Sequence, residues 1–468
     1  MSKKEWLQLI ILLLFPTIIL FAPALRSFFF QDDWFSFSIS SISSFDQVGT
    51  FFKPVKDAVY YRPLGMQVPF FIFRTLFGLT PAPYRIFTLI VHVINGLILY
   101  LIFLKIIKNK LFSAFGALLY MTSAVHFTPM YWFATFAFVL APTFLLTAFS
   151  LFIHKKPALL TVLLFSLGLL VNELVAVLPF LLLSWVLIFE KKRMREIWLY
   201  FATLLTYIGL RLTVFVPQVD QQYALTLNPK QILVNLRNFF LWSLNWPETI
   251  SDHFSTYFSL SSEFVRNFSS ELLIWSICTL VISYICIKQF LLGVRTPEKS
   301  GLRIQIFGLS WFIVSLLPVL FFKHHAFSYY SILPSVGLIL LLINNSKYAL
   351  GNNSNVGRVS LLILLFTMWF VASFATIKVN QVVHWAPQRA RAAEKFLVTL
   401  RNVHPNIPSG SVVIAPKDER LRYALFYNIA VQIVYRDPTI STFYGSFEEY
   451  RSQFPQSEAA IIELPGLN

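Results

Sequence analysis

Long apolar runs separated by short polar segments dominate the chain. About eleven of these runs approach the roughly 20 residues that are needed to cross the hydrocarbon core of a bilayer. We therefore predict about eleven membrane-spanning helices. Their expected ranges are 6–25, 85–103, 111–125, 132–153, 158–171, 174–189, 197–215, 272–290, 304–322, 330–343 and 359–377.

Two segments between the predicted spans are too polar and too interrupted to cross a membrane. The first, 26–83, carries acidic and basic residues throughout. The second, 216–270, contains an apolar and aromatic patch, Gln231–Trp246, which Arg237 and Pro247 make a poor span. We expect this patch to lie along the membrane interface. If it paired with another buried segment instead, the span count would change by two.

From about residue 378 the composition changes to mixed charges with short apolar runs. Two of these runs have the length of strands, Ser411–Ala415 and Ala459–Ile462, and a helical pattern covers Gln388–Arg401. The run Arg422–Tyr435 fits either period. About 90 residues can fold alone, so this part reads as a small α/β domain.

The sequence therefore predicts a mainly α fold. A polytopic transmembrane helical bundle over 1–378 would carry the small C-terminal α/β domain, 379–468. Composition agrees: of 468 residues, 56% are hydrophobic and 13% are charged, whereas soluble domains have about a quarter of charged residues. The formal net charge of +16 does not indicate nucleic-acid binding, because no basic face or binding motif accompanies it.

Lysine and arginine gather in short loops between the runs, as the positive-inside bias predicts for cytoplasmic loops. Lys3 and Lys4 place the N-terminus in the cytoplasm, and the run 190–195 is the strongest cytoplasmic signal. On this count both long loops and the C-terminal domain lie outside. We expect a multi-pass protein of the plasma (inner) membrane with an extracytoplasmic site.

Two adjacent carboxylates, Asp32 and Asp33, follow the first predicted span directly and lie among aromatic residues. A charge near the membrane is costly unless it has a function or a partner, and Arg62 supplies a cation on the same side. Burial raises the pKa of a carboxyl toward that of a useful base, and a nearby cation opposes the shift. The alternative is that the pair only marks an exposed span boundary.

Further candidates lie at other predicted outer ends. Glu173 stands at the turn between two spans, where it is either a site residue or a polar turn residue. Lys323, His324 and His325 precede Tyr330 and suit a phosphate or sugar contact. Two adjacent histidines on one helix point about 100° apart, so they rarely bind one zinc ion together.

His92 and Asn95 lie one helical turn apart and share a face of the second predicted span. Two interpretations of this pair stay open. The residues form a hydrogen bond between helices inside the bundle, or they contribute to a donor site.

These features together carry a resemblance. Asp32-Asp33 after the first span, then the Tyr-Arg-Pro-Leu segment (61–64), then a second span with His92 and Asn95, are similar to the GT-C superfamily of membrane glycosyltransferases. The likeness is to the protein O-mannosyltransferase and aminoarabinose-transferase branch and its bacterial relatives. It covers the first loop, the span count and an outer C-terminal domain.

The resemblance implies an inverting glycosyltransferase, either a hexosyl- or a pentosyltransferase. It would move a sugar from a polyprenyl-phosphate carrier to a hydroxyl of a glycan, lipid or protein. Asp32 or Asp33 would be the catalytic base, with Asp32 preferred because family members place the first acid of the pair there. Donor phosphate or substrate contacts would come from the remaining candidates: Tyr61, Arg62, His92, Glu173, Lys323, His324, His325 and Tyr330.

The pair departs from the Asp-x-Asp spelling of some metal-dependent members. No cofactor is therefore required, although a divalent metal held by Asp32, Glu173 and His324 is an alternative. Two other function classes compete with the enzyme. A lipid or sugar transporter or flippase would need inverted repeats and charges near the membrane midplane, which the sequence lacks. If the protein were a non-catalytic scaffold, nothing would explain why Asp32, Asp33, Arg62 and His324 are all predicted on the same side of the membrane.

Overall fold

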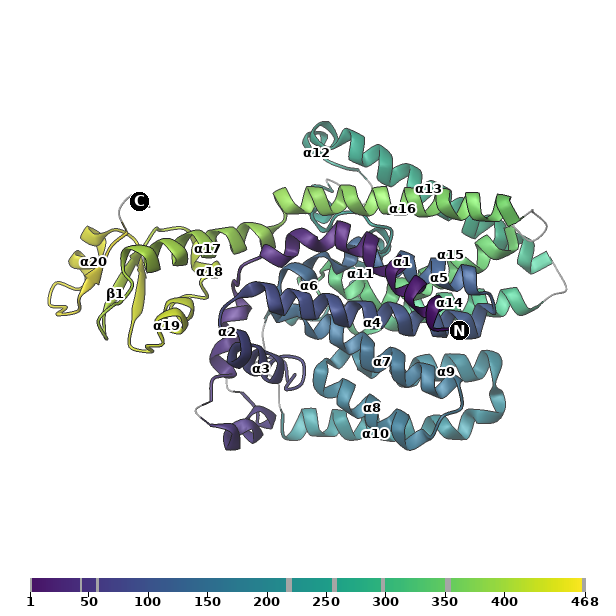
Figure 1. Cartoon of the computed structure of the whole chain (residues 1–468), viewed down its shortest axis with the longest axis horizontal. Coiled ribbons are helices and arrows are strands. Elements are labelled where there is room, and N and C mark those ends of the chain that lie inside the picture. Colours follow the sequence, from purple (N-terminus) through teal and green to yellow (C-terminus); the bar gives the residue numbers. More distant parts are fainter. Residues whose placement is uncertain are drawn as a thin grey trace.

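The computed structural model describes residues 2–42, 44–55, 59–215, 221–254, 259–295, 299–349 and 355–464. Most of its helices run side by side in one bundle, from whose end a smaller part projects (Figure 1). Every predicted span coincides with a helix of this bundle. These helices are α1 (Lys3–Phe21), α4 (Pro81–Ile107), α5 (Lys110–Met121), α7 (Ala137–Ile153), α8 (Ala158–Val171), α9 (Leu178–Phe189), α10 (Met194–Thr213), α13 (Ser269–Arg295), α14 (Lys299–Leu320), α15 (Ile332–Ala349) and α16 (Asn355–Val383).

Among the described residues, six helices are long and apolar enough to cross a membrane, or up to seven if a bent pair counts as one span. The bent pair, Lys110–Met121 with Ala124–Tyr131, turns by 41°. The break is held from outside, because the Asn245 side chain accepts the Ala124 N–H at 2.8 Å and the Ser123 hydroxyl at 3.1 Å. The prediction of a polytopic, mainly helical membrane protein is confirmed.

Local sequence sets the ends and the packing of these helices. Ser2 and Glu5 form a reciprocal capping box at the start of α1, and Pro81 is the first residue of α4. Between α14 and α15, Gly308 and Gly337 lie against each other, and a Cβ atom at Gly337 would clash with the Gly308 carbonyl oxygen. Small residues of this kind let two backbones meet in a membrane bundle.

The predicted first outer loop, 26–83, folds into α2 (Asp32–Ile39), the 3-10 helix η2 (Phe45–Phe52) and α3 (Gln67–Phe77). The predicted second outer loop, 216–270, contains α11 (Pro229–Ser243), η8 (Glu248–His253) and α12 (Ser262–Asn267). The predicted interfacial patch corresponds to α11, which packs against α14 and α15 and buries Asn235, Phe239 and Trp242. One face of α11 is therefore packed against the bundle, while its position along the membrane interface stays a prediction.

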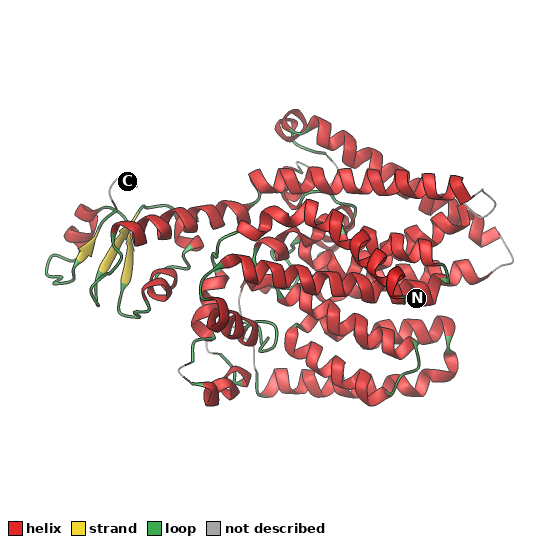
Figure 2. Cartoon of the chain, viewed as in Figure 1, coloured by secondary structure: helices red, strands yellow, loops and turns green. Residues whose placement is uncertain are grey.

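The C-terminal part begins with α17 (Trp385–Val403), which leads away from the bundle (Figure 1). All three described strands lie beyond it (Figure 2). They are β1 (Val412–Ala415), β2 (Ser441–Tyr444) and β3 (Ile461–Ile462), and they form a parallel sheet in the order β2-β1-β3. Three short helices complete this part: α18 (Glu419–Ala424), α19 (Ile429–Tyr435) and α20 (Phe447–Gln453).

This arrangement contains the predicted α/β segment, and the division of the chain near residue 378 stays a prediction. One backbone carbonyl joins the C-terminal part to the first outer loop. The Ala424 oxygen accepts the backbone N–H of Gln31 at 2.8 Å and the indole N–H of Trp34 at 3.1 Å. α2 also contacts α19. The two predicted outer segments therefore meet at α2, beside the acidic pair.

Candidate functional site

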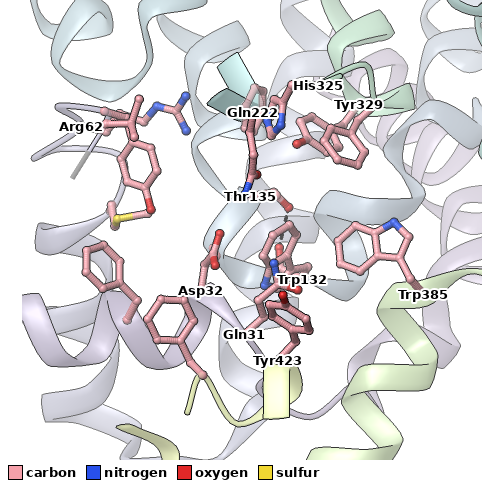
Figure 3. A pocket seen from close by; sticks show the side chains of 18 of the residues that line it. Gln31, Asp32, Arg62, Trp132, Thr135, Gln222, His325, Tyr329, Trp385 and Tyr423 are labelled. Atoms are coloured by element: carbon pink, nitrogen blue, oxygen red, sulfur yellow. Dashed lines mark hydrogen bonds between the residues drawn. The ribbon is translucent and has the colours of Figure 1, made fainter. Parts of the chain in front are cut away.

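A cavity of about 620 Å³ lies where the predicted first outer loop, the bundle end and the C-terminal part meet. Its wall combines charged groups with many aromatic rings, and Figure 3 shows how these side chains surround the space. The lining residues used below are Gln31, Asp32, Phe35, Tyr60, Arg62, Phe138, His325, Phe327, Tyr329, Tyr330, Trp385, Arg389, Tyr423, Phe426 and Tyr427.

Asp32 is the first residue of α2 and its carboxylate points into the cavity (Figure 3). The preceding residue, Gln31, has φ 51°, a left-handed value that non-glycine residues rarely adopt. This sharp turn sends the chain from the end of the first span into α2. Burial raises the pKa of Asp32 to about 6, although Arg389, the Gln31 side chain and Arg62 pull the pKa down.

Asp33 does not line the cavity and is fully buried. One carboxylate oxygen accepts the Ala134 N–H at 2.6 Å, and the other accepts the Phe30 N–H at 3.2 Å and lies 3.9 Å from Arg85. Burial raises the pKa of Asp33 to about 7, against the opposing effect of Arg85 and the two N–H groups. The structure therefore gives Asp33 a place in the core, where it ties α2 to the bundle.

Arg62 is held in a fixed orientation at the cavity wall. Its Nε donates to one Glu173 oxygen at 2.8 Å and its Nη2 donates to the other, so the pair is bidentate. The guanidinium also lies over the rings of Tyr60, at 4.9 Å, and Phe138, at 5.1 Å. Glu173 raises the pKa of Arg62, which overcomes the effect of burial and keeps the group charged. The bidentate pair with Glu173 uses Nε and one N–H of Nη2, which leaves the Nη1 side of the guanidinium for a phosphate oxygen.

Arg389 is a second cation of the cavity that the sequence-based prediction missed. It comes from α17 and donates from Nη1 to the Gln31 side-chain oxygen. Its guanidinium lies 5.1 Å from the Trp385 ring centre and 5.6 Å from that of Tyr423. The sequence signal was weak: Arg389 stands at the start of the predicted helix Gln388–Arg401, one turn after Trp385, and such a pattern is common.

The segment before α15 is divided between cavity and surface. His325 and Tyr330, both predicted as substrate contacts, line the cavity. Lys323 and His324 are exposed and are not among its lining residues. Tyr329 also lines the cavity, and its ring lies 4.8 Å from that of Tyr330. The positive charge expected here therefore lies outside the cavity, at the surface.

A buried carboxylate outside the cavity fixes part of its wall. One Glu248 oxygen accepts from the Ser328 N–H at 2.8 Å and the Ser328 hydroxyl at 2.7 Å. The other accepts from His384 at 3.0 Å and from the Trp385 indole at 3.3 Å. His384 lowers the pKa of Glu248 against burial. This carboxylate joins three segments far apart in sequence, a role that no sequence motif indicated.

Two predicted substrate contacts lie elsewhere. His92 is buried inside the bundle, where its Nε2 lies 3.0 Å from the Met121 carbonyl. Its neighbour Asn95 bonds the Val139 carbonyl and the Thr143 hydroxyl, both at 2.7 Å. These contacts fit the alternative of hydrogen bonds between helices. Tyr61 donates to the Phe52 carbonyl at 2.9 Å, and the preceding tyrosine lines the cavity in its place.

Among the described residues, no group of three or more histidine, cysteine, aspartate or glutamate side chains is arranged to hold a metal ion. Asp32, Glu173 and His324, the candidate ligands, are not such a group. Asp32 and Glu173 are instead matched with cations, because Arg62 is bound to Glu173 and Arg389 lies near Asp32. Among the described residues, each of these two carboxylates therefore has an arginine as its positively charged partner.

The arrangement provides a carboxylate with a raised pKa, a rigid guanidinium and an aromatic enclosure. A carboxyl with a pKa near the operating pH is suited to general-base work. The guanidinium of Arg62 has its Nη1 without a protein partner among the described residues, so it is available to an anion. The cavity can therefore remove a proton at one point and stabilise a negative charge at another.

No family model matches this chain, and no curated protein matches it. Several solved structures are similar to it, including the following two. The arabinofuranosyltransferase AftD from mycobacteria has 13% identity and a TM-score of 0.48, covering 89% of this chain, which spans 30% of the length of AftD. ArnT from Cupriavidus metallidurans, bound to undecaprenyl phosphate, has 12% identity and a TM-score of 0.48, covering 99% of this chain and 90% of ArnT.

Both similar structures belong to the GT-C superfamily, the family that the sequence resembles. Identities of this size and TM-scores below 0.5 do not carry an activity or a substrate over to this chain. Its function has to be inferred from the cavity itself.

Proposed function

We propose that this protein is a membrane glycosyltransferase of the inverting type. It moves a sugar from a polyprenyl-phosphate carrier to an acceptor hydroxyl at the extracytoplasmic face of the plasma membrane. One observation carries the proposal: the Asp32 carboxylate and the Arg62 guanidinium line the same cavity at the end of a membrane bundle. A carrier with a lipid tail and a phosphate needs both a membrane and a cation.

In this proposal Asp32 takes the proton from the acceptor hydroxyl as its oxygen attacks the anomeric carbon. The bond from that carbon to the phosphate oxygen breaks, and the electron pair leaves with the polyprenyl phosphate. This leaving group is already an anion, so it needs a cation rather than a proton donor. Arg62 supplies that cation, and Glu173 holds it in place through the bidentate pair.

The remaining predicted contacts take supporting roles. Tyr330 and His325 both line the cavity, with ring centres 6.0 Å apart, and are proposed to contact the sugar or the phosphate (Figure 3 labels His325). Lys323 and His324, which are exposed, are proposed to attract the anionic carrier at the membrane surface. A hexose and a pentose both fit this scheme, and it requires no metal.

The test is sugar transfer by the purified full-length chain in detergent. The donors are radiolabelled polyprenyl phosphates that carry one hexose or one pentose. We expect consumption of at least one donor, with loss of this consumption in Asp32→Asn. The matched control is Asp46→Asn in the same loop, whose side chain is exposed, and which should keep full activity. Equal turnover by Asp32→Asn and the native chain would refute the role of Asp32.

A further inference from the structure

One wall of the cavity is not used by the donor chemistry. It consists of Trp385, Arg389, Tyr423, Phe426 and Tyr427, all from the C-terminal part. The wall adjoins α2, because the rings of Phe35 and Phe426 lie 5.6 Å apart. This aromatic wall therefore stands next to the helix that begins with the proposed base.

The backbone beneath the wall adopts an unusual conformation at two consecutive residues. Phe426 has φ 48° and Tyr427 has φ 58°, in the left-handed region that disfavours bulky side chains. Their N–H groups bond the Tyr423 and Arg422 carbonyls, both at 3.1 Å, and the Tyr444 hydroxyl donates to the Tyr427 carbonyl at 2.8 Å. Glycine or asparagine would fit this turn at less cost.

A residue that persists in such a conformation is held there by its surroundings, and such residues gather at ligand sites. Here both strained residues are aromatic and both line the cavity. A third left-handed residue, Arg436 (φ 56°), closes α19 in the same part of the chain and does not line it. The two residues with this unfavourable backbone conformation are thus the same ones that contribute aromatic rings to the cavity wall.

We propose that this aromatic wall is the acceptor subsite and that the acceptor is a saccharide. A sugar ring has an apolar face of C–H groups and an edge of hydroxyl groups. The face packs on Phe426 and Tyr427, and Arg389 donates hydrogen bonds to the edge. One hydroxyl then lies at Asp32. The inference rests on the proposed transferase function and deepens it.

Other acceptor classes fit the wall less well. A peptide bound as an added strand needs a free strand edge, and no residue of β1, β2 or β3 lines the described cavity. A lipid chain is matched by a wholly apolar groove, whereas this wall includes the charged residue Arg389 and two tyrosines, Tyr423 and Tyr427. Flat rings beside polar groups are instead typical of a site that orients a small polar ligand.

The experiment measures transfer by the full-length chain to three kinds of acceptor: short oligosaccharides, serine-containing peptides and a long-chain alcohol. The variants are Phe426→Asn and Tyr427→Asn, which remove a ring but keep a residue that tolerates the left-handed region. Arg436→Asn is the matched control for the backbone. We expect transfer to an oligosaccharide, an acceptor KM raised at least tenfold in both ring variants, and a donor KM changed less than twofold.

Arg436→Asn should leave both KM values unchanged, and none of the three variants should lower Tm. Transfer only to the peptide or the alcohol would overturn the inference, as would an unchanged oligosaccharide KM in both ring variants. If no donor is consumed at all, the proposed function fails by itself. The subsite is then judged by saturation-transfer difference NMR with the oligosaccharides: binding lost in Tyr427→Asn supports it, and no binding to the native chain refutes it.

Discussion

The two sides of α2 differ sharply although they are formed by adjacent residues of the same type. Asp32 lines the cavity and interacts electrostatically with Arg389 and Arg62. Asp33 lies in the core, where its carboxylate accepts hydrogen bonds from two backbone N–H groups and lies next to Arg85. Successive helix residues point about 100° apart, which is enough to separate a solvent-accessible cavity from a packed interior. The environment, not the residue type, separates the two roles.

Substitution of Asp32 should give the largest effect, and it should fall on activity alone. Asp32→Asn removes the proposed base, for which a loss of about 10²–10⁴-fold in kcat is expected, or about 3–5 kcal/mol in barrier height. The folded state should not lose stability, because burial disfavours the charged form of this carboxyl. Transfer kinetics and Tm of the same preparation check both parts.

Substitution of Asp33 should produce the reverse pattern. Asp33→Ala leaves the Ala134 and Phe30 N–H groups without their acceptor and leaves Arg85 as a buried charge without its partner. The expected loss is about 3 kcal/mol or more in the free energy of unfolding, measured as a lower Tm and a lower yield in detergent.

The control for this variant is Asp46→Ala in the same outer loop, whose exposed side chain should make it neutral within about 0.5 kcal/mol. If Asp33→Ala is stable but inactive, Asp33 rather than Asp32 is the catalytic base, and the proposed mechanism is wrong on this point.

A smaller effect is expected at the donor wall, where the pair is a cation and its positioning carboxylate. Glu173→Gln removes the charge that holds Arg62 in its bidentate orientation. We expect kcat/KM for the donor to fall about tenfold, equivalent to about 1.4 kcal/mol. Arg62→Gln combined with Glu173→Gln should cost less than the sum of the single changes. Additive losses would mean that the two residues act independently.

The sequence was sufficient for the fold because apolar run length is a local property. Every predicted span coincides with a helix, and the helical run Gln388–Arg401 lies inside α17. The strand β2 was missed because Ser441–Tyr444 is short and shows no alternation of buried and exposed positions. The ambiguous run Arg422–Tyr435 contains the end of α18 and the whole of α19, separated by the left-handed residues Phe426 and Tyr427, which interrupt any single period.

The candidate site was predictable mainly where its residues lie close to a span end. Asp32 and His325 met this condition, whereas Arg62 was predicted from the Tyr-Arg-Pro-Leu segment in the middle of the first long loop; all three line the cavity. Arg389 was not predicted, because its position depends on how α17 packs against α2, a contact between residues more than 350 positions apart. Similarly, the side of α2 on which each aspartate lies follows from tertiary packing, so no local pattern could separate Asp32 from Asp33.

The smallest effect concerns the pH dependence of the reaction and links the two walls of the cavity. A general base must be deprotonated, so kcat should fall as pH drops through the pKa of Asp32, which burial raises to about 6. Arg389 is the strongest influence in the opposite direction, because its charge favours the carboxylate. Its removal must therefore raise this pKa further.

Arg389→Gln should accordingly move the acid limb of the pH–rate profile to higher pH, while Arg436→Gln, which changes an arginine outside the cavity wall, leaves the limb in place. The profile is measured at saturating donor and acceptor, so that a change in acceptor affinity does not enter. If the acid limb of the Arg389→Gln profile does not move, the charge of Arg389 has no effect on the pKa of Asp32. The C-terminal wall would then act through packing alone, and the difference between the two faces of α2 would be set by burial.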